Sequence, residues 1–207
     1  MPKPLKLRGW MLDAARVTET PETYRRVIDA CARWGYNAIM FRLTDDEGCS
    51  LQFQSRPELK THPNALTTEE MKALVRYADV RGVTLIPEVE SFGHTAYITS
   101  VPEHAALADR DPAKPEASFN GLIPVHPKAQ AILKDLYTEA ASIFTGPYLH
   151  GGCDEVNWGG SQMSQDAIGA GSRGEVVAGL LNRLNGLARS LGKELIVWGD
   201  HVIGHSL

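Results

Sequence analysis

Two adjacent carboxylates, Asp154 and Glu155, are the residues of this sequence whose types and spacing best suit chemistry. They follow a short apolar segment that ends in His150, Gly151 and Gly152, which is typical of a strand running into a turn. Beyond a strand end the alternation of side-chain directions no longer holds, so both acids can face one cavity. Neighbouring carboxylates repel each other as anions, so one of them is expected to keep its proton to higher pH. A protonated acid beside an ionised one suits the cleavage of a glycosidic bond, whereas a loop with two solvated acids is the alternative reading.

The segments that must position these acids alternate between strand and helix. Thr20, Pro21 and Glu22 are typical of a helix start, and Thr67 with Glu70 predicts a capping box. The strands are expected at 7–13, 37–43, 83–89, 148–152 and 194–198, and the helices at 21–34, 67–81, 128–144 and 175–191. A loop containing Pro57 and Pro63, a long excursion over 95–127 and a Gly-rich loop over 161–174 are expected between them. The alternation indicates parallel strands joined by crossover helices.

Composition bounds the class of protein. The 207 residues suffice for one domain, and the net charge of -4 gives no basic surface for nucleic acid or an anionic membrane. Three cysteines without paired spacing predict reduced thiols rather than disulfides. No apolar run approaches a membrane span, and the first residues lack the apolar region of a signal peptide. A cytoplasmic location is therefore the default expectation, and a secreted or periplasmic one applies if a leader was removed.

Polar or aromatic side chains follow all five predicted strands. They are Asp13, Arg16, Asp45, Asp46, Glu88, Glu90, His94, His150, Asp154, Glu155, Trp198 and Asp200. In a barrel of strands and helices, and in a doubly wound open sheet, ligands bind at the carboxyl ends of the strands. A nucleotide site has little support, because the sequence contains neither a G-x-G-x-x-G turn after the first strand nor a P-loop.

Four segments together resemble the family 20 glycoside hydrolases, the β-N-acetylhexosaminidases. These are residues 8–16, 43–48, 86–95 and 150–155, which follow the family's order and span nearly the whole chain. The resemblance implies an α/β fold of the (β/α)8 TIM-barrel type, with residues 1–207 as one catalytic domain. Such a barrel has eight strands and about 250 residues, and about five β/α units are expected here, so the barrel is incomplete.

The resemblance also implies a reaction, the removal of terminal β-linked N-acetylhexosamine with retention of configuration. The substrate's own 2-acetamido oxygen attacks the anomeric carbon, so the protein needs no carboxylate nucleophile. A buried Glu155 is implied as the general acid and then the base, and Asp154 as the residue that orients the acetamido group. The implied partner is a carbohydrate, and no cofactor or metal is expected.

Further roles come from the same resemblance. Arg16 is implied to grip sugar hydroxyls, Trp198 to form a wall of the acetamido pocket, and His150 to belong to the substrate site. His94 and one of Asp45 and Asp46 are implied to stand behind Glu155. Two residues depart from the family: Glu90 replaces the usual aspartate and is expected to reach toward His94, and Cys153 replaces a glycine and is expected to crowd the turn. Trp10 and Trp34 are expected to be core or packing residues.

Two other functions compete with this reading. A partial barrel can bind amino sugars without turnover. A metal-dependent hydrolase can use His94, His150, Asp154 and Glu155 as ligands, with His201 and His205 spaced four residues apart. A sheet that stops at five strands also has two open edges, so self-association through them is expected.

Overall fold

A five-stranded parallel sheet forms the centre of the protein. The computed structural model describes residues 5–111, 113 and 121–200. The sheet consists, in spatial order, of β1 (Gly9–Asp13), β2 (Ala38–Arg42), β6 (Thr84–Glu88), β7 (Tyr148–His150) and β8 (Glu194–Ile196). The spatial order of the five strands is the same as their order in the sequence, whereas the strand order of a doubly wound sheet reverses part-way across the sheet. The fold is therefore α/β of the TIM-barrel type, and the described part of the barrel is open.

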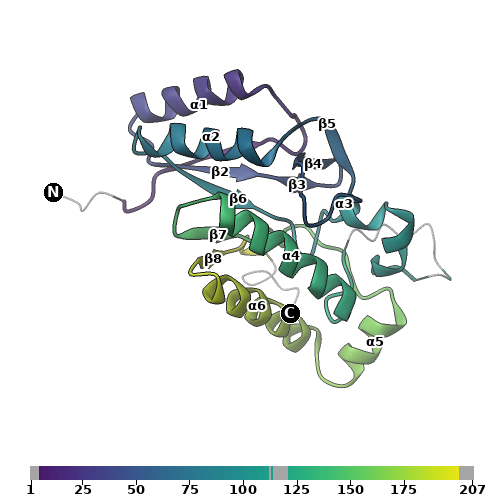
Figure 1. The fold of residues 1–207 in the computed structure, drawn as a ribbon. Coiled ribbons are helices and arrows are strands. Elements are labelled where there is room, and N and C mark those ends of the chain that lie inside the picture. The colour runs from purple at the N-terminus through teal and green to yellow at the C-terminus, as the bar shows by residue number, and fades with distance from the viewer. Residues whose placement is uncertain (1–4, 112, 114–120, 201–207) are drawn as a thin grey trace.

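The crossover helices lie together on the outer side of the sheet, as Figure 1 shows. They are α1 (Pro21–Arg33), α2 (Thr68–Asp79), α4 (Pro127–Ile143) and α6 (Arg173–Ser190). The expected starts of the first two are confirmed, because Thr20 caps α1 and Thr67 forms a capping box with Glu70 at α2. Each strand of the main sheet is two residues shorter than the sequence predicted.

The hydrophobic core fills the space between these helices and the sheet. Strand residues such as Ile39, Phe41 and Leu149 are buried there, and helical residues such as Tyr24 and Tyr137 pack against them. Burial of a large apolar side chain stabilises a fold by roughly 1.5–3 kcal/mol, so this layer holds the outer face of the sheet firmly. The carboxyl ends of the strands are thereby fixed relative to one another.

Three regions expected to be irregular contain regular structure. The segment with Pro63 forms β5 (Thr61–Leu66), which joins β3 (Thr44–Asp45) and β4 (Gly48–Leu51) in a small second sheet. Proline is tolerated because β5 is an edge strand. The excursion contains α3 (Ala96–Thr99) and the 3-10 helix η1 (Pro102–Leu107). The Gly-rich segment contains α5 (Gln162–Gly169), whose first turn is capped by Ser161.

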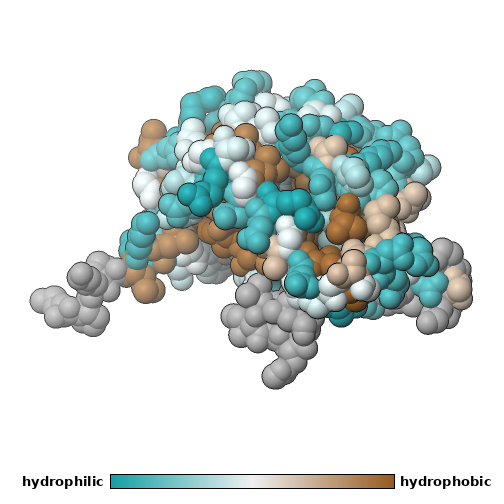
Figure 2. Space-filling model, turned by 90° about the horizontal axis from the view of Figure 1, so that it is seen from below, coloured by the Kyte–Doolittle hydropathy of each residue, from teal (hydrophilic) through white to brown (hydrophobic). Residues whose placement is uncertain are grey.

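The inner face of the sheet is apolar and open. A cavity of about 300 Å³ lies on it, lined by Leu7, Gly9, Trp10, Met11, Ala38, Met40, Ile86, His150, Ile196, Val197 and Trp198. In the view from below, hydrophobic surface runs in a band beside the polar rim (Figure 2). Of the two readings for Trp10 and Trp34, the packing one holds and the core one does not: their rings pack 6.4 Å apart, and they are 44% and 65% exposed. No helix within the described ranges has the length and apolarity needed to cross a membrane.

Candidate active site

The carboxyl ends of the strands surround a polar cavity of about 420 Å³. Its lining residues are Met11, Arg16, Arg42, Asp154, Glu155, Trp198, Gly199 and Asp200. Five of the residues singled out in the sequence therefore meet at one cavity, although they come from loops after β1, β7 and β8. Their convergence follows from the parallel sheet, whose strands all end at this edge.

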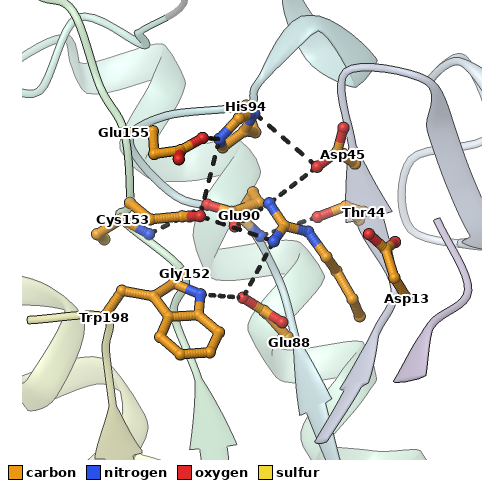
Figure 3. Close-up of polar contacts among 12 residues, drawn as sticks. Asp13, Thr44, Asp45, Glu88, Glu90, His94, Gly152, Cys153, Glu155 and Trp198 are labelled. Atoms are coloured by element: carbon orange, nitrogen blue, oxygen red, sulfur yellow. Dashed lines mark hydrogen bonds and ion pairs between the residues drawn. The ribbon is translucent and has the colours of Figure 1, made fainter. Parts of the chain in front are cut away.

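His94 stands between Glu155 on one side and Asp45 on the other (Figure 3). Asp46 also contacts its ring. The Nδ1 of His94 lies 3.2 Å from Oδ2 of Asp46, and its Nε2 lies 3.4 Å from Oε2 of Glu155. The hydrogen bond with Asp46 raises the pKa of His94, against the opposing effect of burial. Asp45 is farther from His94, at 3.9 Å, so Asp46 is the aspartate behind the histidine. These contacts link Asp46, His94 and Glu155 in one polar chain.

Arg42 is a functional candidate that the sequence analysis missed. Its side chain is 3% exposed, and its Nη2 lies 2.8 Å from both Asp45 Oδ2 and Glu90 Oε1. Its Nη1 lies 3.7 Å from Asp154 Oδ2. Glu90, Glu88, Asp154 and Asp45 together raise its pKa although burial opposes the charge. The only sequence signal was an arginine at the end of an otherwise apolar strand.

Arg16 reaches the same acidic group from the rim of the cavity. Its Nη2 lies 3.1 Å from Asp45 Oδ2 and its Nη1 lies 3.3 Å from Asp13 Oδ2. The Arg16 side chain is 46% exposed, so its guanidinium remains accessible from the cavity that it lines. Asp45 thus joins a buried arginine to an exposed one.

Glu90 is fully buried behind the acid pair. Its carboxyl accepts a hydrogen bond of 3.0 Å from the N–H of Cys153, and its backbone N–H donates to Thr44 Oγ1 at 2.8 Å. Burial raises the pKa of Glu90 well above its ordinary value despite Arg42, and a hydrogen bond with Asp154 raises it further. Glu90 therefore keeps its proton to higher pH than an ordinary glutamate, and the expected approach to His94 is not among its contacts in the described structure.

His150 lies behind Trp198, which lines the polar cavity. The indole N–H of Trp198 donates to Glu88 Oε1 at 2.7 Å, and the two rings lie 4.9 Å apart. His150 accepts a hydrogen bond from the N–H of Gly152, and burial lowers its pKa to about 4, so the ring is neutral. Burial also raises the pKa of Glu88 to about 7. His150 lines the apolar cavity rather than the polar one, so it supports Trp198 from behind.

The backbone around the acids is strained. His94, Cys153 and Glu155 have φ values of 48°, 77° and 45°, a left-handed region that costs about 1–3 kcal/mol for residues other than glycine. Cys153, where the family usually has a glycine, thus keeps a backbone conformation that favours glycine. The prediction that Glu155 is buried is wrong, because its side chain is 76% exposed. Such strain clusters at functional sites, where packing holds it in place.

Some of these residues are also arranged as metal ligands would be. His94, Asp154 and Glu155 offer ligand atoms within 4.8 Å of one another, and so do Asp45, Asp46 and His94. His150 belongs to no such group among the described residues, and its Nδ1 is already engaged by Gly152. His201 and His205 lie outside the described residues.

Comparison with known proteins identifies the family. The sequence model of the glycosyl hydrolase family 20 catalytic domain matches residues 5–206. The chain belongs to this family. Among family 20 relatives, a β-hexosaminidase of Vibrio furnissii is 30% identical over 94% of this chain, and the β subunit of Felis catus β-hexosaminidase is 25% identical over 94%. The matched regions are 37% and 40% of those two proteins.

Solved family 20 structures agree with the fold. A chitobiase of Flavobacterium johnsoniae superposes with a TM-score of 0.84 at 26% identity, covering 97% of this chain and 32% of that one. An exo-β-N-acetylglucosaminidase of Vibrio harveyi, solved with N-acetylglucosamine, has a TM-score of 0.82 at 26% identity, covering 98% and 36%. The chain thus spans less than half the length of the relatives that it matches.

Proposed function

We propose that the protein serves the hydrolysis of terminal β-linked N-acetylhexosamine by a retaining, substrate-assisted mechanism. The main support for this proposal is the series of contacts from Asp46 through His94 to Glu155. Asp154 lines the same cavity as Glu155. The names of the relatives, β-hexosaminidase and exo-β-N-acetylglucosaminidase, support this class of substrate.

In this proposal Glu155 protonates the leaving oxygen, and His94 and Asp46 control the proton on Glu155. The 2-acetamido oxygen then attacks the anomeric carbon, and Glu155 takes a proton from the water that opens the resulting ring. Asp154 accepts a hydrogen bond from the acetamido N–H and offsets the positive charge on the intermediate. Arg42 and Glu90 hold Asp154 in place, and Arg16 and Trp198 bind the sugar.

The role of Glu155 is tested by Glu155→Gln, assayed with an aryl N-acetyl-β-glucosaminide. The amide has nearly the same shape but cannot donate the proton, so turnover should fall by about 100-fold or more. Glu47→Gln is the matched control, because Glu47 is an exposed acid beside Asp46 in the chain. Near-normal turnover by Glu155→Gln would remove Glu155 from the mechanism.

The role of Asp154 is tested by Asp154→Asn on paired substrates. Turnover of the acetamido substrate should fall, whereas any weak hydrolysis of the matching glucoside, which lacks the acetamido group, should change much less. Arg16→Ala should instead weaken binding of both sugars. If Asp154→Asn matched the wild type in single-turnover assays, substrate assistance would be the wrong scheme.

A carbohydrate-binding role without turnover is the second candidate. The open sheet favours it, because the wall opposite β1 and β8 is absent from the described fold. Binding of N-acetylglucosamine without hydrolysis of the aryl glycoside would support this role. A metal-dependent hydrolase is the weaker alternative, and metal analysis with activity measured before and after chelation decides it.

We also propose that the chain associates with itself through its open sheet edges or works within a larger assembly, with low activity alone. The edges at β1 and β8 present unpaired backbone groups, and Trp10 and Met11 leave apolar surface exposed nearby. Light scattering and the glycoside assay on one sample test both halves. A monodisperse monomer with full turnover would overturn this proposal.

A further inference from the structure

The loop that carries the acids is anchored at its far end by a buried carboxylate. Asp109, which follows η1, is fully buried. It accepts hydrogen bonds from the N–H groups of Gly159 and Ser161, at 2.6 and 2.7 Å, and from the hydroxyl of Ser164 at 2.9 Å. One side chain therefore fixes both the return of the loop and the first turn of α5.

A second carboxylate holds the near end of the loop. Asp200, two residues after Trp198, accepts a hydrogen bond of 2.9 Å from the backbone N–H of Glu155. Glu155 is one of the residues with positive φ, a conformation that a residue other than glycine keeps only when its surroundings impose it. The bond to Asp200 is such a constraint, and it acts on the residue that contacts His94.

Asp109 is itself tied to the segment that carries His94. Its backbone N–H donates to the carbonyl of Gly121 at 2.9 Å, and Leu122 N–H donates to the carbonyl of Phe92 at 2.9 Å. The ring of Phe92 packs 5.4 Å from that of Trp158, which lies in the acid-bearing loop. The loop and the segment around His94 therefore share one support.

We propose that Asp109 and Asp200 are positioning residues that together hold the loop 153–161 so that Glu155 meets His94. The catalytic part of this inference rests on the proposed function. Neither residue acts on the sugar itself in this account. Asp109 sets where the loop returns, and Asp200 sets the backbone of Glu155.

The contacts predict different responses to the same substitution. Asp200 accepts the Glu155 N–H through Oδ2, so Asp200→Asn can present its amide oxygen to the same N–H, whereas Asp200→Ala removes the acceptor. Asp109 uses both oxygens for three donors, so Asp109→Asn places an amide NH₂ against an N–H group. Asparagine should therefore rescue position 200 and fail at position 109.

The test measures turnover and backbone amide exchange on the full chain. In Asp109→Asn, Asp109→Ala and Asp200→Ala, kcat for the aryl N-acetyl-β-glucosaminide should fall about 10- to 100-fold with little change in KM, because a misplaced acid slows chemistry more than binding. Asp200→Asn should stay within about threefold of the wild type, since it keeps the acceptor. Asp166→Asn, in α5, is the control for changing an exposed acid nearby.

Amide exchange tests whether Asp109 and Asp200 hold the loop, independently of the activity assay. Segment 155–161 should exchange roughly tenfold faster in the two alanine variants, while α2 exchanges as in the wild type. Unchanged exchange in 155–161, or equal loss of kcat in Asp200→Asn and Asp200→Ala, would overturn the inference. If the wild type lacks turnover but the exchange changes as expected, the proposed function fails, whereas the structural role of Asp109 and Asp200 in holding the loop is supported.

Discussion

The two ends of the sheet's inner surface differ in whether their side chains have partners within the described fold. At the carboxyl ends of the strands, Arg42 is enclosed by Asp45, Glu90 and Asp154, and each of these charges has a partner of opposite sign or a hydrogen bond. Farther along the same face, Met11 and Met40 line an apolar cavity that no described element covers, and Met11 is 38% exposed.

This difference shows which part of the barrel is self-sufficient. The polar network needs only β2, β3 and the loops that follow β6 and β7, because Arg42, Asp45, Glu90 and Asp154 come from those elements. The apolar face needs side chains from further strands to fill it, as in a closed barrel. The acid-bearing site is thus organised even where the barrel is open.

Removal of the buried cation should break the organised end. Arg42→Met removes the buried cation that pairs with Asp45, Glu90 and Asp154, and loss of one member of a buried ion network costs roughly 3–5 kcal/mol of unfolding free energy. Arg26→Met is the control, because Arg26 is 75% exposed and pairs with Glu22 at the surface. Urea unfolding measures both, and similar small losses would contradict the importance of the network.

Truncation of two residues paired across β1 and β2 should sharpen the contrast. Trp10 and Ile39 lie opposite each other in register, but Ile39 is buried and Trp10 is 44% exposed. Ile39→Ala should cost about 2–5 kcal/mol. Trp10→Ala should cost only about 1 kcal/mol, from its contacts with Trp34 and Tyr36. Equal losses in urea unfolding would mean that Trp10 is covered in solution.

A pair of glycines tests how tightly the site is packed. Gly152 and Gly192 both have positive φ, but a Cβ at 152 would run into the carboxyl of Glu90, whereas nothing lies within 4 Å at 192. Gly192→Ala should cost about 1–2 kcal/mol for the backbone alone. Gly152→Ala should cost about 1–3 kcal/mol more because Glu90 must move. Thermal unfolding of the two variants would refute this packing if their losses were equal.

The smallest expected effect is a change in pH dependence. The pKa of Glu88 is about 7 in the folded protein and near its ordinary 4.5 when unfolded, so the folded state binds more protons between these values. Its contribution to stability is therefore present below pH 4.5 and is lost as pH rises through about 7. Glu88→Gln should gain on the wild type over this window, by at most about 1.4 kcal/mol per pH unit. A difference that stays constant from pH 5 to 8 would contradict it.

Much of the fold followed from local signals in the sequence. The apolar segments around Ile39 and Leu85 marked strands, and Thr20 and Thr67 marked helix starts, because capping is a local contact. The acid pair was found for the same reason, since Gly151 and Gly152 announce a turn after a strand. Asp154, Glu155, Arg16 and Trp198 do line one cavity.

The remainder depended on contacts between distant segments. Arg42 read as one residue of a strand, and only its approach to Glu90 and Asp154 reveals its place at the centre of the site. Asp109 lay within a stretch interpreted as an irregular excursion, although its partners are some fifty residues away along the chain. α5 escaped notice because its few apolar residues gave little periodicity.

The order of strands has a consequence for how the protein is made. Each strand of the main sheet pairs with the one translated before it in that sheet, so the sheet can grow at a single edge as the chain leaves the ribosome. The β2–β6 ladder runs from Ala38 opposite Thr84 to Arg42 opposite Glu88, whereas β6 meets β7 through Glu88 opposite His150. The segment that joins β6 to β7 is the longest connection between neighbouring strands of the sheet, so β7 can pair only after that segment has been synthesised. Until then we expect the nascent chain to contain β1, β2 and β6 together with α1 and α2.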